Sequence, residues 1–260
     1  MGDYNLKGKG VVVTGGAQGI GLATAKVFAR YGARLFLLDL KEAQAAAEEL
    51  HELGAQADWG LCDVSREDSV REGVAKAVAC LGAVDVLINC AGVTNSSILK
   101  DLPLEQWRKI MAINADSVFM MTKETANHMI AKGVRGSIVN VSSQASKMPE
   151  YGNAVYCCSK AVVNTLTQTF ALELAEYGIR VNAVCPGYID TIIMQRVFRE
   201  RGPLEGMTPE QYEAHLMKNV PLGRMAQPSE IGEFIAFLAS DNASYITGVA
   251  HTIAGGSTLI

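Results

Sequence analysis

Short apolar runs alternate with amphipathic segments along most of the chain. The apolar runs read as buried strands at 10–15, 33–39, 56–61, 84–92, 137–143, 179–187 and 248–253. Between them, apolar residues recur every three or four positions, which is the period of a helix with one buried face. This pattern predicts helices over 20–31, 42–54, 66–81, 104–112, 114–132, 154–177 and 229–239.

Strands that alternate with helices in this way predict parallel β-α-β units with right-handed crossovers. The strands are nearly continuous apolar runs, as expected when helices cover both faces of a sheet. We therefore predict an α/β protein with a doubly wound parallel sheet, a Rossmann fold, in a single domain over residues 1–260. The stretch 191–219 is more polar and less regular, and we predict that it forms a lid over a ligand site.

The helix predicted over 154–177 carries an unusual pair of side chains. Tyr156 and Lys160 are four residues apart and therefore lie on one face. An ammonium group near a core costs free energy unless it has partners. The same helix has an apolar row that we expect to pack inward, made of Cys158, Val162, Leu166, Phe170 and Leu174.

Composition bounds the possible classes of protein. The chain has 260 residues, of which 49% are hydrophobic and 19% charged, so it can bury a large core and is not disordered. The net charge of −4 argues against a nucleic-acid partner. The first ten residues lack an apolar signal core, and no run of about 18 apolar residues occurs, so we expect no membrane partner and a cytoplasmic location.

The six cysteines show no C-x-x-C spacing, which favours free thiols in a reducing compartment over disulfides. Four of them, Cys62, Cys90, Cys158 and Cys185, fall in apolar patterns and are predicted to be buried. The four histidines are scattered, so no metal site is predicted.

The first strand is followed by a glycine-rich turn, "TGGAQGIG" at 14–21. Glycine permits a tight turn and a close approach of backbone to a ligand, and the helix N-terminus behind it favours anions. A pyrophosphate would fit here, although a plain tight turn is the simpler interpretation. The residues predicted to contact a dinucleotide in this turn are Gly15, Gln18, Gly19, Ile20 and Gly21.

The second strand ends in Asp39, 18 residues after Gly21. A carboxylate at this point can accept hydrogen bonds from both hydroxyls of an adenosine ribose, and it would repel a 2′-phosphate. Neither Leu40 nor Gln18 supplies a positive charge for such a phosphate. We therefore predict NAD rather than NADP as cofactor. Asp39 could also cap a helix that starts near Lys41, and the two roles are compatible.

With these features the chain resembles the short-chain dehydrogenase/reductase family, most of all its NAD-dependent polyol and secondary-alcohol dehydrogenases. "TGGAQGIG" matches T-G-x-x-x-G-x-G, "NCAG" (89–92) matches N-N-A-G with Cys90 as a departure, and "YCCSK" matches Y-x-x-x-K. "CDV" (62–64) and "PGYIDT" (186–191) resemble segments near adenine and nicotinamide. The resemblance adds these cofactor contacts: Asp63, Val64, Asn89, Ala91, Gly92, Tyr156, Lys160, Pro186, Gly187, Ile189 and Thr191.

The resemblance also implies a catalytic set of Asn114, Ser143, Tyr156 and Lys160. Tyr156 would accept the proton of an alcohol while hydride leaves, but a phenol of pKa about 10 is a poor base at neutral pH. An ammonium about 4 Å away supplies on the order of 4 kcal/mol, enough to lower that pKa by about 3 units. Ser143 would hold the substrate oxygen, and Asn114 would anchor a water that links Lys160 to solvent. In purely structural roles, Lys160 would be a snorkelling lysine and Ser143 and Asn114 would be capping residues.

Substrate residues are expected after the strand ends: Ser143, Gln144, Glu150, Asn153, Tyr156 and Tyr188. Their hydrogen-bonding side chains suit a small-molecule alcohol or ketone with several hydroxyls, and we favour a polyol and its ketose. Lys147, Arg196, Arg199 and Arg201 could hold the phosphate of a polyol phosphate, or could form a solvated charged face. The chain could instead act on a 3-oxoacyl or 3-hydroxyacyl substrate, or serve as a non-catalytic NAD-binding redox sensor.

The family resemblance further implies a homo-oligomer, a dimer or tetramer. Its contacts would be made by the helices at 104–132 and 154–177 and by the C-terminal strand.

Overall fold

The computed structural model describes residues 4–259 and contains one seven-stranded sheet in which all strand pairs are parallel. The strand order is β3-β2-β1-β4-β5-β6-β7. The strands are β1 Gly10–Thr14, β2 Arg34–Asp39, β3 Ala57–Leu61, β4 Val86–Asn89, β5 Ser137–Val141, β6 Arg180–Pro186 and β7 Ala250–Ile253. The predicted doubly wound α/β fold in a single domain is confirmed.

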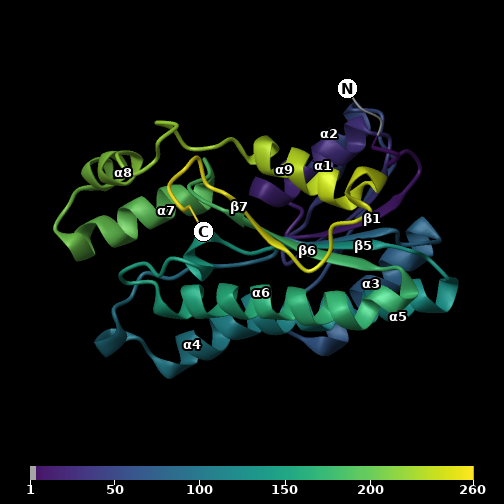
Figure 1. Cartoon of the computed structure of the whole chain (residues 1–260), viewed down its shortest axis with the longest axis horizontal. Coiled ribbons are helices and arrows are strands. Elements are labelled where there is room, and N and C mark those ends of the chain that lie inside the picture. The colour runs from purple at the N-terminus through teal and green to yellow at the C-terminus, as the bar shows by residue number, and fades with distance from the viewer. Residues whose placement is uncertain (1–3, 260) are drawn as a thin grey trace.

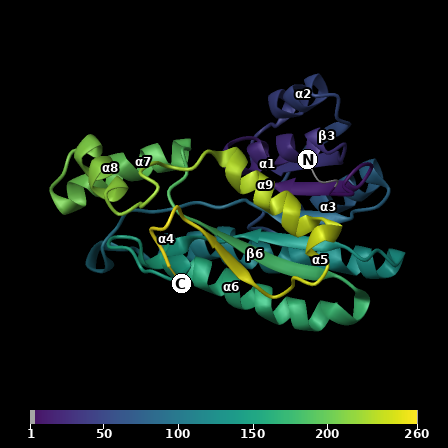
Figure 2. The ribbon, with the colours of Figure 1, turned by 45° about the horizontal axis from the view of Figure 1, so that its top comes forward.

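Helices cover both faces of this sheet, as Figures 1 and 2 show. On one face lie α1 Gly19–Arg30, α2 Gln44–Glu52 and α9 Pro228–Ala239. On the other face lie α3 Glu67–Leu81, α5 Ser117–Lys132 and α6 Ala154–Leu174, with α4 Leu104–Met111 packed against α6. The remaining helices, α7 Ile192–Arg201 and α8 Pro209–Met217, extend beyond one end of the sheet (Figure 1).

The alternation of side chains along each strand divides the interior into two cores. Val11 and Val13 pack with α1 and α9 on one face, whereas Val12 packs with α3 and α5 on the other. Leu37 and Leu38 in β2 alternate in the same way. Both faces of the central strands are therefore buried, which explains why these strands are mostly apolar in sequence, whereas the edge strands β3 and β7 are partly exposed.

The strand order reverses between β1 and β4. The chain leaves β1 toward β2 and leaves β4 toward β5, so the two connections diverge and leave a crevice beyond the carboxyl ends of these strands. The helices α7 and α8 lie at this end of the sheet in Figure 1. The fold thus places the glycine-rich turn, the end of β4 and the segment after β6 around one crevice.

The two helices predicted at 104–112 and 114–132 form one continuous helical run. A π-helical turn, Ala112–Asp116, joins α4 to α5 without a break. Such widened turns are rare and often occur at functional sites. Asn114, which the sequence placed at the start of the second helix, lies inside this turn and is buried.

The inward face expected for α6 is wrong in the first half of the helix, although Phe170 and Leu174 of the predicted row do pack against the core. Its buried residues are Val155, Cys157, Ser159, Lys160, Val163, Thr167 and Ala171. Cys158 and Val162, from the predicted row, are exposed, and Leu166 is only partly buried. Polar side chains can face inward here because they have partners: Thr167, for example, accepts a hydrogen bond from Asn140 Nδ2 at 2.9 Å. The prediction that Cys158 is a buried thiol is also wrong, because Cys158 lies on the exposed side of α6. Cys62 and Cys185 are buried, as predicted.

The stretch 191–219, here called the lid segment, contains α7 and α8 and has a small core of its own. This core consists of Val197, Phe198, Tyr212 and Leu216. Each helix begins with a threonine cap, because Thr191 accepts from the N–H of Met194 and Thr208 accepts from that of Gln211. The segment is therefore a structured helical pair, and its action as a lid stays a prediction.

Within residues 4–259, no helix is both long enough and apolar enough to cross a membrane.

Candidate active site

The glycine-rich turn joins β1 to α1 and holds its shape through close backbone contacts. A Cβ on Gly21 would lie 2.1 Å from the carbonyl oxygen of Gly15, so only glycine fits there. Gly19 has φ +58°, and a Cβ built on it would meet only Thr191 Cγ2, at 4.0 Å. Thr191 therefore stands across an open space from the turn. A ligand that fills this space would contact both the glycine-rich turn and the segment around Thr191. Both were predicted from the sequence to contact the cofactor.

The first turn of α1 is suited to an anion. Its N-cap residue, Gln18, makes no side-chain capping bond, and no acidic residue lies in the first turn. The leading backbone N–H groups are thus not taken by a capping side chain, and the helix dipole favours negative charge at this end. These features fit the pyrophosphate of a dinucleotide.

Asp39 is held at the edge of the same turn. Its Oδ2 accepts a hydrogen bond from Ala17 N at 3.0 Å, and its Oδ1 accepts one from Lys41 N at 3.1 Å. The carboxylate is therefore oriented by backbone before any ligand binds. It does not cap α2, whose N-cap residue is Ala43. The capping role foreseen for Asp39 is thus limited to the turn around Lys41.

The segments after β3 and β4 complete the predicted cofactor side. Asp63 is fixed by its own turn, with Oδ1 accepting from Ser65 Oγ at 2.6 Å, and Val64 beside it is buried. Asn89 donates through Nδ2 to Asn140 Oδ1 at 2.9 Å and to Thr122 Oγ1 at 3.2 Å. This amide nitrogen joins β4 to β5 and α5, so any contact of Asn89 with a cofactor must use other atoms.

Gly92 leaves room between two of the predicted catalytic residues. A Cβ on Gly92 would lie 3.4 Å from both Asn114 Oδ1 and Lys160 Nζ. On the neighbouring strand, Thr14 Oγ1 accepts from the backbone N–H groups of Cys90 and Ala91 at 3.0 and 3.1 Å. These hydrogen bonds hold the loop after β4 against β1. Cys90, which replaces the second asparagine of the family motif, contributes through its backbone N–H.

After β6, the chain runs along the opposite wall of the crevice. Pro186 ends the strand, and Gly187 N donates to Ile253 O at 2.9 Å. Thr191 Oγ1 donates to Ile189 O at 3.3 Å and also caps α7. The structure thus brings the predicted residues of this segment together opposite the glycine-rich turn.

The four predicted catalytic residues come from three places: Asn114 from the π-helical turn, Ser143 from the segment after β5, and Tyr156 and Lys160 from α6. Asn114 forms a reciprocal pair with the backbone of Val93, with both bonds at 2.9 Å, and donates to Ser159 Oγ at 3.0 Å. The π-helical turn therefore aligns Asn114 with the loop after β4 and with α6. Lys160 is buried, and its Nζ donates to Val141 O at 2.7 Å.

The two adjacent serines after β5 have different roles. Ser142 Oγ donates to the backbone carbonyl of Lys160 at 3.0 Å, which fastens α6 to the sheet. The Ser143 hydroxyl lowers the pKa of the Tyr156 phenol, and Ser143 Oγ accepts a hydrogen bond from Ala145 N at 3.1 Å. Of the two, Ser143 is therefore the serine whose hydroxyl acts on Tyr156, as the family resemblance implied.

The protein's own groups do not produce an activated tyrosine. Burial raises the pKa of Tyr156 to about 12 and lowers that of Lys160 to about 8, so at neutral pH the pair is a phenol and an ammonium. Lys160 Nζ lies 5.8 Å from the centroid of the Tyr156 ring and is bonded to a carbonyl. Desolvation is thus the largest influence on the pKa of Tyr156 in this geometry, and the lowering of that pKa by Lys160 together with a bound nicotinamide stays a prediction.

The predicted substrate residues separate into two groups. Gln144 Oε1 accepts from Ser257 Oγ at 2.8 Å and from Thr258 Oγ1 at 3.0 Å, and Gln144 also makes a side-chain bond with Tyr188. It thus holds the C-terminal end of the chain at the site. Sequence reasoning missed this contact, because no local pattern in the tail signals it.

The second group contains Glu150 and Asn153, in the loop before α6. Asn153 Nδ2 donates to Glu150 Oε2 at 2.9 Å, and the same oxygen accepts from Arg201 Nη1 at 2.5 Å. The basic residues that could have held a phosphate do not converge. Arg196 pairs with Glu200, and Lys147 Nζ donates to Ala250 O and Thr252 Oγ1.

A parallel sheet with a glycine-rich anion cradle, an acidic residue at the end of β2 and a tyrosine–lysine pair at the same edge defines a dinucleotide-dependent oxidoreductase. Residues 15–258 match a family model described as enoyl-(acyl carrier protein) reductase. The chain belongs to the short-chain dehydrogenase/reductase family.

Relatives align over nearly the whole chain. Oxidoreductase UcpA of Salmonella typhimurium is 41% identical over 98% of this chain and 96% of its own. The cis-4-hydroxycyclohexanecarboxylate dehydrogenase of Sinomonas cyclohexanicum is 39% identical over 96% of each chain. Among solved structures, that of an NAD⁺-bound xylitol dehydrogenase has a TM-score of 0.93 at 34% identity, covering 96% of this chain and 99% of the other.

Proposed function

We propose that this protein transfers a hydride between NAD(H) and a secondary alcohol or ketone, with a polyol and its ketose as the favoured pair. The observation that carries the proposal is the placement of Asn114, Ser143, Tyr156 and Lys160 around the crevice that the glycine-rich turn and Asp39 also line. NAD would supply the hydride acceptor and, near Tyr156, a positive charge.

In this mechanism, Ser143 donates a hydrogen bond to the substrate oxygen as negative charge develops on it. Tyr156 takes the hydroxyl proton, and its phenolate is stabilised by Ser143 and by the Lys160 ammonium. Lys160 would also bond to the nicotinamide ribose. Asn114, held by Val93 and Ser159, would anchor a water that carries the proton from Lys160 to solvent.

Cofactor choice follows from Asp39. Its carboxylate, oriented by Ala17 and Lys41 backbone N–H groups, would accept from the adenosine ribose hydroxyls and repel a 2′-phosphate. Leu40 beside it is exposed and offers no charge. The similarity to an NAD⁺-bound xylitol dehydrogenase supports both NAD and a polyol substrate.

Two different functions fit parts of the same site. A relative from Thermotoga maritima that is 38% identical over 96% of this chain is named a 3-oxoacyl-(acyl-carrier-protein) reductase, which supports a 3-oxoacyl or 3-hydroxyacyl substrate. Asp39 disfavours the NADP expected for reduction. A non-catalytic NAD-binding redox sensor needs no proton path, so the buried set around Lys160 and Asn114 speaks against it.

We also propose that the chain forms a homo-oligomer through α5 and α6. Their outer surface carries a recess of about 580 Å³ lined by Phe119, Met120, Val162 and Leu166, among others. Phe119 packs on Phe170 of α6 with ring centroids 6.4 Å apart. Leu166→Asp should therefore lower the molar mass measured by light scattering, whereas an unchanged mass would contradict this interface. The cytoplasmic location stays a proposal, which the six free cysteines support.

The test of function is NADH formation with NAD, then NADP, against a panel of pentitols, hexitols, butane-2,3-diol and 3-hydroxybutyrate. We expect turnover of a polyol with NAD, and a loss of about 10²–10⁴-fold or more in Tyr156→Phe with NAD binding retained. Turnover with NADP alone would contradict the role of Asp39. NAD binding without any turnover would favour the sensor.

A further inference from the structure

One buried ion pair joins the lid segment to the loop that precedes the catalytic tyrosine. Arg201 Nη1, at the end of α7, lies 2.5 Å from Glu150 Oε2. The two side chains are only 7% and 21% exposed, whereas the pair formed by Arg196 and Glu200 on the same helix is 60% and 34% exposed. A buried pair costs desolvation free energy, so its presence calls for a role beyond stability.

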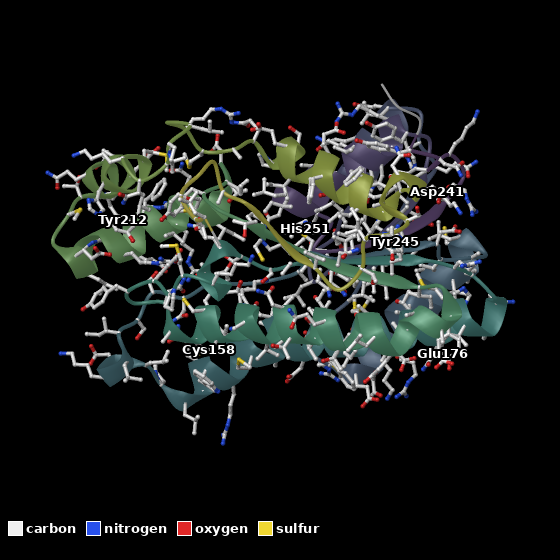
Figure 3. All side chains as sticks on the ribbon, in the orientation of Figure 1. Cys158, Glu176, Tyr212, Asp241, Tyr245 and His251 are labelled. Carbon is white, nitrogen blue, oxygen red and sulfur yellow. The ribbon has the colours of Figure 1, made fainter. Side chains whose placement is uncertain are left out.

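The pair continues into a hydrogen-bonded chain. Asn153 donates to Glu150 Oε2, and Thr94 Oγ1 donates to Asn153 Oδ1 at 3.3 Å. The contacts thus run from α7, through the loop before α6, to the loop after β4. Gly152 lies against the lid segment as well, because a Cβ there would be 3.2 Å from Leu204 Cδ1. Figure 3 shows Tyr212 of the lid segment and Cys158 of α6 at the same end of the molecule.

Unpartnered polar atoms gather along this chain. Across residues 4–259, nine buried side-chain nitrogen and oxygen atoms lack a hydrogen-bond partner, and four of them belong to Asn95, Ser96 and Arg201. They are Asn95 Oδ1 and Nδ2, Ser96 Oγ and Arg201 Nε. Asn95 and Ser96 directly follow Thr94 in the loop after β4. Because proteins satisfy nearly all buried polar groups, such a concentration marks a place that bound hydroxyls can complete.

Both charges of the pair act on the reacting centre. Glu150 raises the pKa of Tyr156 and Arg201 lowers it, and the two act in the same opposing way on Tyr188. One negative and one positive group, themselves paired, thus lie within electrostatic reach of Tyr156. An anionic substrate group entering here would lose its water shell next to a carboxylate, while the guanidinium is already paired.

We propose that the Glu150–Arg201 pair is a specificity determinant that selects neutral, multiply hydroxylated substrates over anionic ones. Arg201 Nε, Asn95 and Ser96 offer hydrogen bonds to hydroxyls beyond the carbon that is oxidised. This inference rests on the proposed alcohol dehydrogenase function of the same site and adds a rule for substrate charge.

The test uses matched pairs of ligands: xylitol with xylonate, and ribitol with ribonate. Within a pair, a terminal hydroxymethyl group is replaced by a carboxylate. Binding is measured by calorimetry in the Tyr156→Phe variant loaded with NAD, so that no turnover occurs. The kcat/KM values are measured in the protein that keeps Tyr156. We expect at least one polyol to bind tenfold or more tightly than its aldonate.

Glu150→Gln removes the carboxylate and leaves Arg201 uncompensated, so the preference for the polyol should fall at least tenfold and aldonate binding should strengthen. Glu150→Gln/Arg201→Gln removes both charges, so aldonate binding should be weaker than in Glu150→Gln while the preference for the polyol stays below that of the unchanged protein. This double variant keeps the test open if Glu150→Gln alone does not fold. Glu200→Gln, which breaks the exposed pair on the same helix, is the matched control and should change neither ligand.

Equal binding of polyol and aldonate, no binding of either, or an equal effect of Glu150→Gln on both would overturn the inference. The proposed function fails separately. Absence of turnover with the charge preference present in binding would refute only the dehydrogenase activity. Turnover without the charge preference would refute only the role of the ion pair.

Discussion

The buried Lys160 should destabilise the folded protein at neutral pH, although the proposed mechanism needs its charge. Its pKa is lowered from 10.5 to about 8 because the ammonium has lost its hydration. The difference of about 2.5 units corresponds to about 3 kcal/mol at about 1.4 kcal/mol per unit. At neutral pH the fold therefore carries this penalty to keep a charged lysine beneath Tyr156.

The sign of the pH dependence follows from proton binding. The folded pKa lies below the unfolded value, so between about 8 and 10.5 the unfolded state binds more protons and stability rises with pH. The penalty is fully present below pH 8 and disappears as pH approaches 10.5. From about pH 7 to about pH 9.5, Lys160 should contribute a gain of about 2 kcal/mol to the free energy of unfolding.

The measurement compares the unchanged protein with Lys160→Met, which removes the charge and keeps a similar length. Thermal melts at equal protein concentration, without cofactor, should show the unchanged protein gaining about 4–8 °C on the variant over that pH range. The variant also loses the bond to Val141 O, which costs about 1–3 kcal/mol at any pH. A melting difference that does not change with pH would refute the reasoning, whichever protein is the more stable.

Two further predictions concern charge at the two ends of the crevice. Asp39→Ala should raise kcat/KM with NADP relative to NAD by tenfold or more, because the repulsion of a 2′-phosphate is removed. The ratio of the two kcat/KM values, measured with one alcohol, checks this. An unchanged ratio would contradict the role assigned to Asp39. Glu150→Gln should shift the alkaline-rising limb of kcat/KM for alcohol oxidation to lower pH, because Glu150 raises the pKa of Tyr156. The groups that act on that phenol besides Glu150 are Ser143, Arg201 and Cys157, and a shift to higher pH would be the wrong sign.

Local patterns in the sequence were enough for the fold. The central strands are short, mostly apolar runs because both sheet faces are covered there, and apolar residues recur every three or four positions in the connecting helices. The glycine-rich turn, Asp39 and the spacing of Tyr156 and Lys160 are also local features. Their meeting at one edge follows from the rule that parallel strands end together. For these reasons the sheet and most of the proposed site could be predicted.

The inward face of α6 could not be predicted in this way. An apolar row and a row with polar members both run along the helix, and periodicity alone favoured the apolar one. The structure buries Ser159 and Thr167 because Asn114 and Asn140 are in place to bond them. The row with Val162 and Leu166 is left on the outside, beside Phe119 of α5.

The sequence by itself thus determined the order of elements, the sheet and the residue types at the crevice, because these depend on neighbours a few residues apart. Only the tertiary structure decided that Arg201 meets Glu150, that Gln144 holds the C-terminal Ser257 and Thr258, and that Lys160 bonds Val141 O. The pKa values of Tyr156 and Lys160 belong to this second group. They depend on how much water each group loses, and that is set by elements brought together from distant parts of the chain.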